Sequence, residues 1–163
     1  MGRGRGIRQS RGGVTRRHSH TMTRMCCEDA PPPPLLEGIA QFNRGEYFEQ
    51  HETLERLWRA EPRDIRRLYQ GILQIGVAFH HLRRGNHHGT VYMLTRGAYY
   101  LRRFPSPCQG VDVAALLDAA ARALAEVERL GPARLHEFDW RLAPRVRLAG
   151  RPECASSSII GQA

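Results

Sequence analysis

The stretch YFEQHETLERLW carries the groups best placed to do chemistry together. His51 and Glu55 are four residues apart, so on a helix their side chains lie next to each other. Both fall within the arc of the predicted apolar face, which consists of Tyr47, Phe48, Leu54 and Trp58. A histidine and a carboxylate at this spacing can share a divalent metal ion, and Glu52 could act beside such a metal as a general base. The pattern departs from the H-E-x-x-H of zinc proteases, because Glu55 stands where the second histidine would be.

A second polar group follows in the segment 64–84. Gln70, Gln74 and His81 share one face of the predicted helix, at spacings of four and seven residues. Antiparallel packing against the helix that carries His51 would bring the two groups together. Because each unsatisfied buried polar group costs about 1–3 kcal/mol, we expect these side chains to pair with one another or with a ligand.

Three interpretations of these residues stay open. In the first, they form a polar network that fixes helix register. In the second, they form a ligand-binding site, whose members are His51, Glu52, Glu55, Trp58, Gln70, Gln74, His81 and Asn86. In the third, His51, Glu55 and His81 bind a divalent metal in a hydrolase-like enzyme, with Glu52 as a weak candidate for the catalytic base. The sequence contains no nucleophile elbow, phosphate loop or dinucleotide fingerprint, which favours a non-catalytic protein and indicates no particular cofactor.

The segment HHLRRGNHHG, residues 80–89, has two interpretations as well. Its arginines and histidines could hold an anion at the start of the following helix, where free backbone N–H groups point outward. Alternatively Gly85 ends one helix and Asn86 caps the next, in a solvated turn. The second interpretation is the simpler one.

The positions of glycine, proline and helix-capping residues along the chain predict an all-α fold. Helices are expected at 35–43, 46–59, 64–84, 90–103 and 113–130, and no segment has the pattern of a strand. The segment 64–84 is predicted to be central, because residues 68–82 carry no formal charge if the histidines are neutral. Arg44-Gly45 and Arg84-Gly85 lie 40 residues apart in similar surroundings, which predicts a compact array of about five helices, built from two helix-turn-helix hairpins and a C-terminal helix.

Composition predicts three regions. Residues 1–33 are expected to be a disordered basic and proline-rich arm, 34–148 the helical domain, and 149–163 a disordered tail. The net charge is +9, and seven arginines lie in the first 30 residues. Such an arm could bind nucleic acid through phosphates, which is a third functional alternative. It could equally be unstructured, or be translated from upstream of a true start at Met22 or Met25.

Localisation and partners follow from what the sequence does not contain. The four cysteines have no paired spacing, so neither a zinc site nor a disulfide is expected. Without a signal-peptide core or a run of about 20 apolar residues, the protein is predicted to be cytoplasmic and not to bind membranes. The expected partner is a small ligand or a protein, with nucleic acid less favoured. A homo-oligomer is a further option if Tyr99, Tyr100 and Phe104 form an exposed face and not part of the core.

Three runs of residues resemble a known family. FNRGEYFEQHETLERLW, QGILQ and RRGNHHG occur in this order, and together they are similar to the small helical proteins grouped as domain of unknown function 309. The resemblance covers about residues 35 to 104. It implies a compact all-helical domain with the candidate residues above at motif positions, and it implies no activity.

Overall fold

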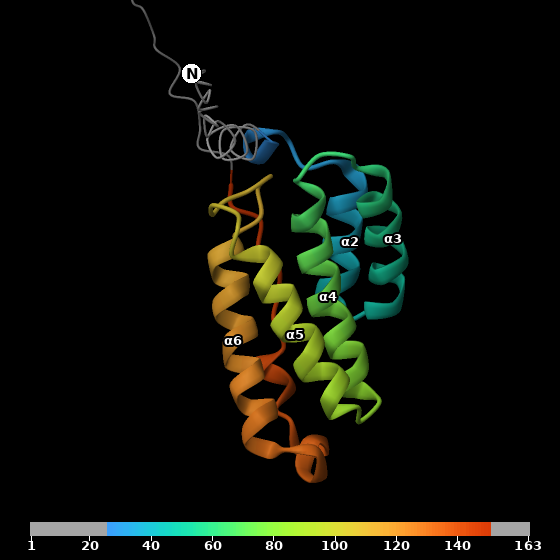
Figure 1. Ribbon diagram of the computed structural model, residues 1–163, viewed down its shortest axis with the longest axis vertical. Coiled ribbons are helices and arrows are strands. Elements are labelled where there is room, and N and C mark those ends of the chain that lie inside the picture. The colour runs from blue at the N-terminus through green and yellow to red at the C-terminus, as the bar shows by residue number, and fades with distance from the viewer. Residues whose placement is uncertain (1–25, 151–163) are drawn as a thin grey trace, which may run out of the picture.

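The computed structural model describes residues 26–150, so predictions about residues 1–25 and 151–163 lie outside it. The predicted all-α fold is confirmed (Figure 1), and within the described range the only β pairing is isolated bridges at Cys108, Val111 and Leu148. The helices are α2 (Pro33–Asn43), α3 (Tyr47–Ala60), α4 (Arg66–Arg83), α5 (His87–Leu101) and α6 (Val113–Leu130), followed by the 3₁₀ turns η1 (Pro132–Glu137) and η2 (Trp140–Leu142).

Two antiparallel hairpins, α2–α3 and α4–α5, turn in the same way. Gly45 and Gly85 both adopt a left-handed conformation, with φ of 74° and 69°. In each turn the residue after the glycine donates its N–H back across the helix end, from Glu46 to the carbonyl of Gln41 and from Asn86 to that of His81. This bonding pattern is that of a Schellman motif, and it explains why an Arg-Gly pair recurs after 40 residues.

Helix α4 is the central helix, as predicted, and lies between α3 and α5 (Figure 1). Its apolar stripe is buried throughout, and most of that stripe is fully inaccessible. The stripe consists of Ile65, Leu68, Ile72, Ile75, Phe79 and Leu82. A helix with neighbours on several sides needs uncharged residues around most of its circumference, which accounts for the missing charges.

Glycines bring α4 and α5 into close contact. A Cβ atom added at Gly97 would lie 2.9 Å from the carbonyl oxygen of Gly71, and one added at Gly71 would lie 3.1 Å from that of Gly97. Because these neighbours are backbone atoms, a side chain at either position would push the helices apart. The α4–α5 hairpin is therefore a tightly joined unit.

Helix α6 and the C-terminal segment cover the other side of α5. Asp112 caps α6 by accepting a hydrogen bond from the backbone N–H of Ala115 at 3.0 Å. Leu135 and Phe138 are buried, whereas Trp140 keeps 43% of its surface exposed. Backbone hydrogen bonds from Asp112 to Arg147 and from Ala149 to Gly110 then hold the segment up to residue 149.

Two sequence-based predictions about the N-terminal region were wrong. Cys26 and Cys27, assigned to a disordered arm, are part of the hydrophobic core, and Cys27 forms a disulfide with Cys108, 81 positions away. The backbone N–H of Gln109 also donates to the carbonyl of Cys27 at 2.7 Å. The partners are too far apart in sequence for spacing to reveal them, because the fold alone brings the start of the domain to the α5–α6 loop.

Within the described part of the chain, no helix combines the length and the apolar character that crossing a membrane requires.

Candidate functional site

The buried face of α3 is rotated from the predicted one. Phe48, expected in the apolar face, is 57% exposed, whereas Gln50, which was not predicted, is completely buried. His51 and Glu55 are half-buried at the edge of the contact with α4, and Glu52 is exposed. The prediction assigned both Tyr47 and Phe48 to the buried face because both are aromatic. Adjacent residues of a helix point about 100° apart, so one of the two had to point away from the core.

Gln50 is the polar residue that contacts the central helix most closely. Its amide nitrogen donates to the carbonyl of Ile72 at 3.5 Å, and its Oε1 has no hydrogen-bond partner in the part of the chain that the structure describes. A Cβ atom at Gly76 would lie 2.2 Å from that oxygen. Gly76 therefore makes room for a buried carboxamide.

The predicted metal ligands do not form a metal site. Glu55 pairs instead with Arg59 across one helical turn, at 2.7 Å. Among residues 26–150 no group of three histidine, cysteine, aspartate or glutamate side chains is arranged to hold a metal ion. His51, Glu55 and His81 are thus not brought together as a three-ligand set, and Glu52 has no metal site beside which to act.

The other predicted polar residues lie along the contact between α3 and α4. Arg66 stacks over the ring of Trp58 at 5.4 Å, and Arg67 donates to Gln70 Oε1 at 2.6 Å. Of the five buried side-chain polar atoms without a partner in the described residues, four lie on these two helices: Gln50 Oε1, Trp58 Nε1, Arg66 Nε and Gln74 Oε1. The predicted antiparallel pairing of α3 and α4 is correct, but their polar groups are not paired with one another.

His81 and Asn86 belong to the α4–α5 turn and not to the α3–α4 contact. Asn86 Oδ1 accepts a hydrogen bond from the N–H of Gly89 at 2.9 Å, and its amide nitrogen lies 3.2 Å from His81 Nδ1. Burial first, then the nearby positive charges of His80 and Arg84, lower the pKa of His81. Asn86 is therefore the helix cap that the simpler interpretation expected.

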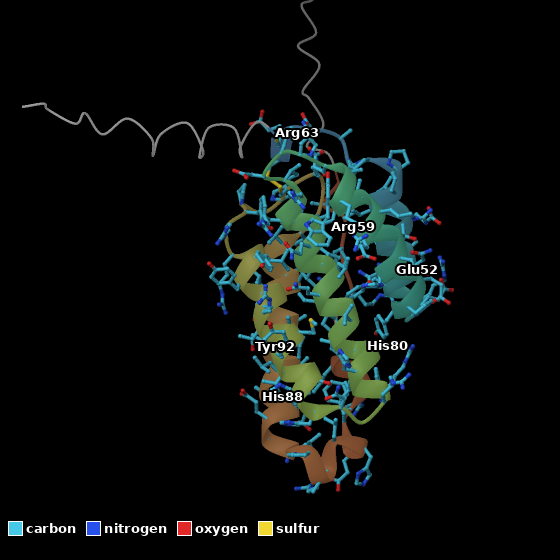
Figure 2. The ribbon with its side chains drawn as sticks, turned by 45° about the vertical axis from the view of Figure 1, so that its right-hand side comes forward. Glu52, Arg59, Arg63, His80, His88 and Tyr92 are labelled. Atoms are coloured by element: carbon cyan, nitrogen blue, oxygen red, sulfur yellow. A yellow bond between two sulfur atoms is a disulfide. The ribbon has the colours of Figure 1, made fainter. Side chains whose placement is uncertain are left out.

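The most distinctive surface lies on α5 and was not predicted from the sequence. Five exposed side chains follow one another at spacings of four, four, three and four residues. These spacings place them on a single face of α5, which continues into the two residues after the helix ends. We call this face the tyrosine–arginine stripe; it consists of His88, Tyr92, Arg96, Tyr99 and Arg103. Figure 2 shows Tyr92 and His88 on α5, across α4 from Glu52 and Arg59 on α3.

The side chains of the stripe are organised by contacts with one another. Arg96 donates to the hydroxyl of Tyr92 at 2.9 Å and to that of Tyr100 at 2.9 Å. Arg103 donates to the hydroxyl of Tyr99 at 2.7 Å. The rings of His88 and Tyr92 are nearly parallel, 16° apart. Each guanidinium is thus held beside a tyrosine ring.

The hairpin that carries the stripe has charged residues of one sign. Between Asp64 and Asp112 the chain has seven arginines and neither aspartate nor glutamate. The preceding hairpin is the opposite, because residues 33–64 contain seven acidic residues and four arginines. The fold therefore sets a basic hairpin, α4–α5, beside an acidic one.

Two signals in the sequence could have located the stripe. One is the 4-4-3-4 spacing of tyrosine, histidine and arginine, and the other is the long interval without acidic residues. Tyr99, Tyr100 and Phe104 were expected to form one face if they were exposed and not part of the core. In the structure Tyr99 is 55% exposed, whereas Tyr100 and Phe104 are each 9% exposed and belong to the interior.

Comparisons with known proteins agree with the resemblance. Residues 35–93 match the family described as domain of unknown function (DUF309). The uncharacterized protein YpuF of Bacillus subtilis (strain 168) is 32% identical over 73 residues, which are 44% of this chain and 42% of that protein. An uncharacterized protein of Aquifex aeolicus (strain VF5) is 22% identical over 80 residues, 48% of this chain and 24% of the relative.

The alignments thus span about a quarter of one relative and less than half of the other. The matched segment runs from α2 into α5 and includes His88 and Tyr92, but it ends before Arg96, Tyr99 and Arg103. The predicted resemblance is confirmed over that segment: residues 35–93 of this chain match the DUF309 family.

Proposed function

We propose that this protein is a binding domain whose helical hairpins form a scaffold, and that it recognises an anionic partner through the exposed face of α4–α5. The observation that carries the proposal is the basic segment between Asp64 and Asp112, with seven arginines and no acidic residue. Surface arginines are usually interspersed with acids, as they are on α3 and α6. A one-signed surface attracts ligands of opposite charge and speeds their association.

The pairing of the arginines supports this proposal. Arg59, Arg122 and Arg129 each form an ion pair with a carboxylate on their own helix. Arg96 and Arg103 instead donate to tyrosine hydroxyls, which are neutral, so no carboxylate among residues 26–150 compensates their charge. An anionic partner would supply the missing negative charge.

The test compares two double variants of equal net charge. Arg96→Ala with Arg103→Ala removes charge from the stripe, and Arg122→Ala with Arg129→Ala removes it from α6. Fluorescein-labelled heparin is titrated in full-length protein, and the dissociation constant is measured at several salt concentrations. We expect the stripe variant to bind at least about tenfold more weakly, with a shallower salt dependence. If both variants bind heparin equally weakly, affinity depends only on the net charge of the protein and not on the stripe, and the proposal is wrong.

A second candidate is a polar ligand at the α3–α4 contact, favoured by the four unpartnered polar atoms there. Gln74 is 9% exposed and its Oε1 has no partner. Gln74→Leu keeps the approximate size while removing an amide that costs about 1–3 kcal/mol if unsatisfied. If the Gln74 amide does not contribute to folding, Gln74→Leu should melt at the same temperature as the unmodified protein or at a higher one. Gln70→Leu is the comparison: it loses the hydrogen bond from Arg67 and should melt at a lower temperature. A marked loss of stability in Gln74→Leu would make it a structural residue and remove this candidate.

A further inference from the structure

We infer that the anionic partner is single-stranded nucleic acid, with bases stacked on Tyr92 and Tyr99 and phosphates bound by Arg96 and Arg103. This inference rests on the proposed function, since it names the partner of the same surface. It also assigns nucleic-acid binding to the folded domain, where the sequence had suggested only the N-terminal arm.

The exposed tyrosine rings of the stripe favour nucleic acid over an acidic protein as the partner. Tyr92 is 46% exposed and Tyr99 is 55% exposed, although a tyrosine can bury its ring at little cost if only its hydroxyl needs water. Arginines alone would suffice for carboxylates. Exposed aromatic rings interleaved with arginines are the arrangement by which proteins bind single strands, because every base has a face that can stack.

The contacts of the stripe leave part of each tyrosine accessible. The guanidinium carbon of Arg96 lies over the Tyr92 ring, 5.5 Å from its centre, and a nitrogen of Arg96 donates to the hydroxyl. The guanidinium carbon of Arg103 lies over the Tyr99 ring, 4.9 Å from its centre, and a nitrogen of Arg103 donates to that hydroxyl. With these arginines in place, Tyr92 and Tyr99 still expose 46% and 55% of their surface. A base can therefore stack on the accessible part of each ring while the arginine beside it meets a phosphate.

The two tyrosine–arginine pairs repeat along the helix. Tyr92 to Tyr99 and Arg96 to Arg103 are both steps of seven residues, or about 10.5 Å at 1.5 Å per residue. A flexible single strand can adjust its backbone to place a base on each ring. A duplex cannot, because its bases are already stacked on one another. The surface should therefore prefer single strands.

The experiment measures binding of full-length protein to fluorescein-labelled oligo(dT) of 20 nucleotides, oligo(rU) of the same length and a 20-base-pair duplex by fluorescence anisotropy. Tyr92→Leu and Tyr99→Leu remove a ring and keep apolar bulk. Each should weaken binding to the single strands by about fivefold or more, since stacking contributes at least about 1 kcal/mol per base. Tyr99→Phe keeps the ring and should bind within about twofold of the unmodified protein.

Phe48→Leu is the matched control, because Phe48 is an exposed aromatic residue on the acidic hairpin, 57% accessible. It should leave binding unchanged. The arginines of residues 1–25 are present in every variant, so they contribute the same background throughout. Circular dichroism melting of each variant shows that an altered affinity does not reflect unfolding, which is not expected for exposed side chains.

The outcomes separate this inference from the proposed function. If loss of Arg96 and Arg103 abolishes heparin binding but both leucine variants bind oligo(dT) normally, the anionic surface stands and base stacking is overturned. Duplex binding as tight as single-strand binding would overturn it as well. If size-exclusion chromatography shows a dimer that Tyr99→Leu dissociates, the stripe is covered by a second copy of the chain and the inference fails. If neither heparin nor oligonucleotide binding depends on the stripe, both proposals fall.

Discussion

At the scale of single residues, Asn86 determines which protonation state of His81 the fold accepts. The Asn86 carbonyl oxygen is already used by the N–H of Gly89, so the amide nitrogen must face His81 Nδ1. That nitrogen can only donate, which requires an unprotonated Nδ1. A protonated His81 would place two donors against each other, in agreement with a pKa lowered chiefly by burial.

This arrangement predicts a pH dependence of stability. Because the pKa of folded His81 is lower than that of the unfolded chain, about 6.5, the unfolded state binds the proton more tightly. The contribution of His81 is complete above about pH 6.5 and is lost as the pH falls from there through the folded pKa. NMR titration should give a His81 pKa below the usual value. In urea unfolding, the free energy of unfolding should decrease from pH 6.5 toward pH 5, and His81→Gln should lack this decrease.

Asn86→Asp is the complementary change. A carboxylate can still accept from Gly89 and can also accept from a protonated His81, so the pKa of His81 should rise above that of the unmodified protein. The stability loss below pH 6.5 should then shrink or reverse. An unchanged His81 titration in this variant would show that Asn86 does not set the protonation state.

Gln50 and Gly76 form a second residue-scale pair. Gly76→Ala places a methyl group 2.2 Å from the present position of Gln50 Oε1, and Gln50 is fully buried and has little room to move. We expect the free energy of unfolding to fall by about 1–3 kcal/mol. In Gln50→Ala the same glycine substitution should be nearly neutral. A double-mutant cycle from urea unfolding measures the difference, and additive effects would exclude the contact.

At the scale of elements, the α4–α5 hairpin is held by the contact at Gly71 and Gly97. Both the basic charge and the tyrosine–arginine stripe lie on this hairpin, so the contact supports the proposed binding surface. The stripe needs a rigid helix, because its side chains cooperate at fixed spacings.

Gly97→Ala tests this contact. Alanine would normally stabilise a helix interior by about 0.5–1 kcal/mol relative to glycine. Here its Cβ would lie 2.9 Å from a backbone oxygen of α4 and 2.7 Å from Ile75 Cγ1. We expect a net loss of about 1–3 kcal/mol in urea unfolding. Ala121→Gly, at an exposed position of α6, is the control, because it measures the difference in helix propensity between alanine and glycine alone. Stabilisation by Gly97→Ala would show that the helices can separate without cost.

At the scale of the whole molecule, the disulfide joins the start of the folded domain to the α5–α6 loop. Disulfides persist chiefly in oxidising compartments, and cytosolic ones are rare. The Cys27–Cys108 bond therefore weighs against the predicted cytoplasmic location, or else marks a bond that forms only under oxidising conditions. Peptide mapping without reduction, after alkylation of cells, would distinguish these cases.

Loss of the disulfide should be measurable in purified protein. Cys108→Ser, or reduction of the unmodified protein, releases a covalent loop closed over 81 positions. We expect the free energy of unfolding to fall by about 2–4 kcal/mol. The reductant should have no further effect on Cys108→Ser. Identical melting of oxidised and reduced protein would show that the bond adds no stability.

Much of the fold was predictable because its signals are local. The turn glycines at positions 45 and 85, the Asn86 cap and the charge-free face of α4 depend on residues close together in the sequence. The polar candidates were predicted less well. A small error in the orientation of α3 exchanged Phe48 for Gln50 as an inward residue, and the expected metal ligands then fell on the edge of the contact instead of converging.

The all-α class, the two hairpins and the central position of α4 follow from local sequence patterns, because helix periodicity and capping act within a few turns. Which polar groups meet depends on tertiary packing. Whether Glu55 binds a metal or Arg59, whether Cys27 reaches Cys108, and whether Tyr99 is exposed while Tyr100 is buried all depend on the rotation and packing of helices. Those rotations come from contacts between residues far apart in the chain, which no local pattern records.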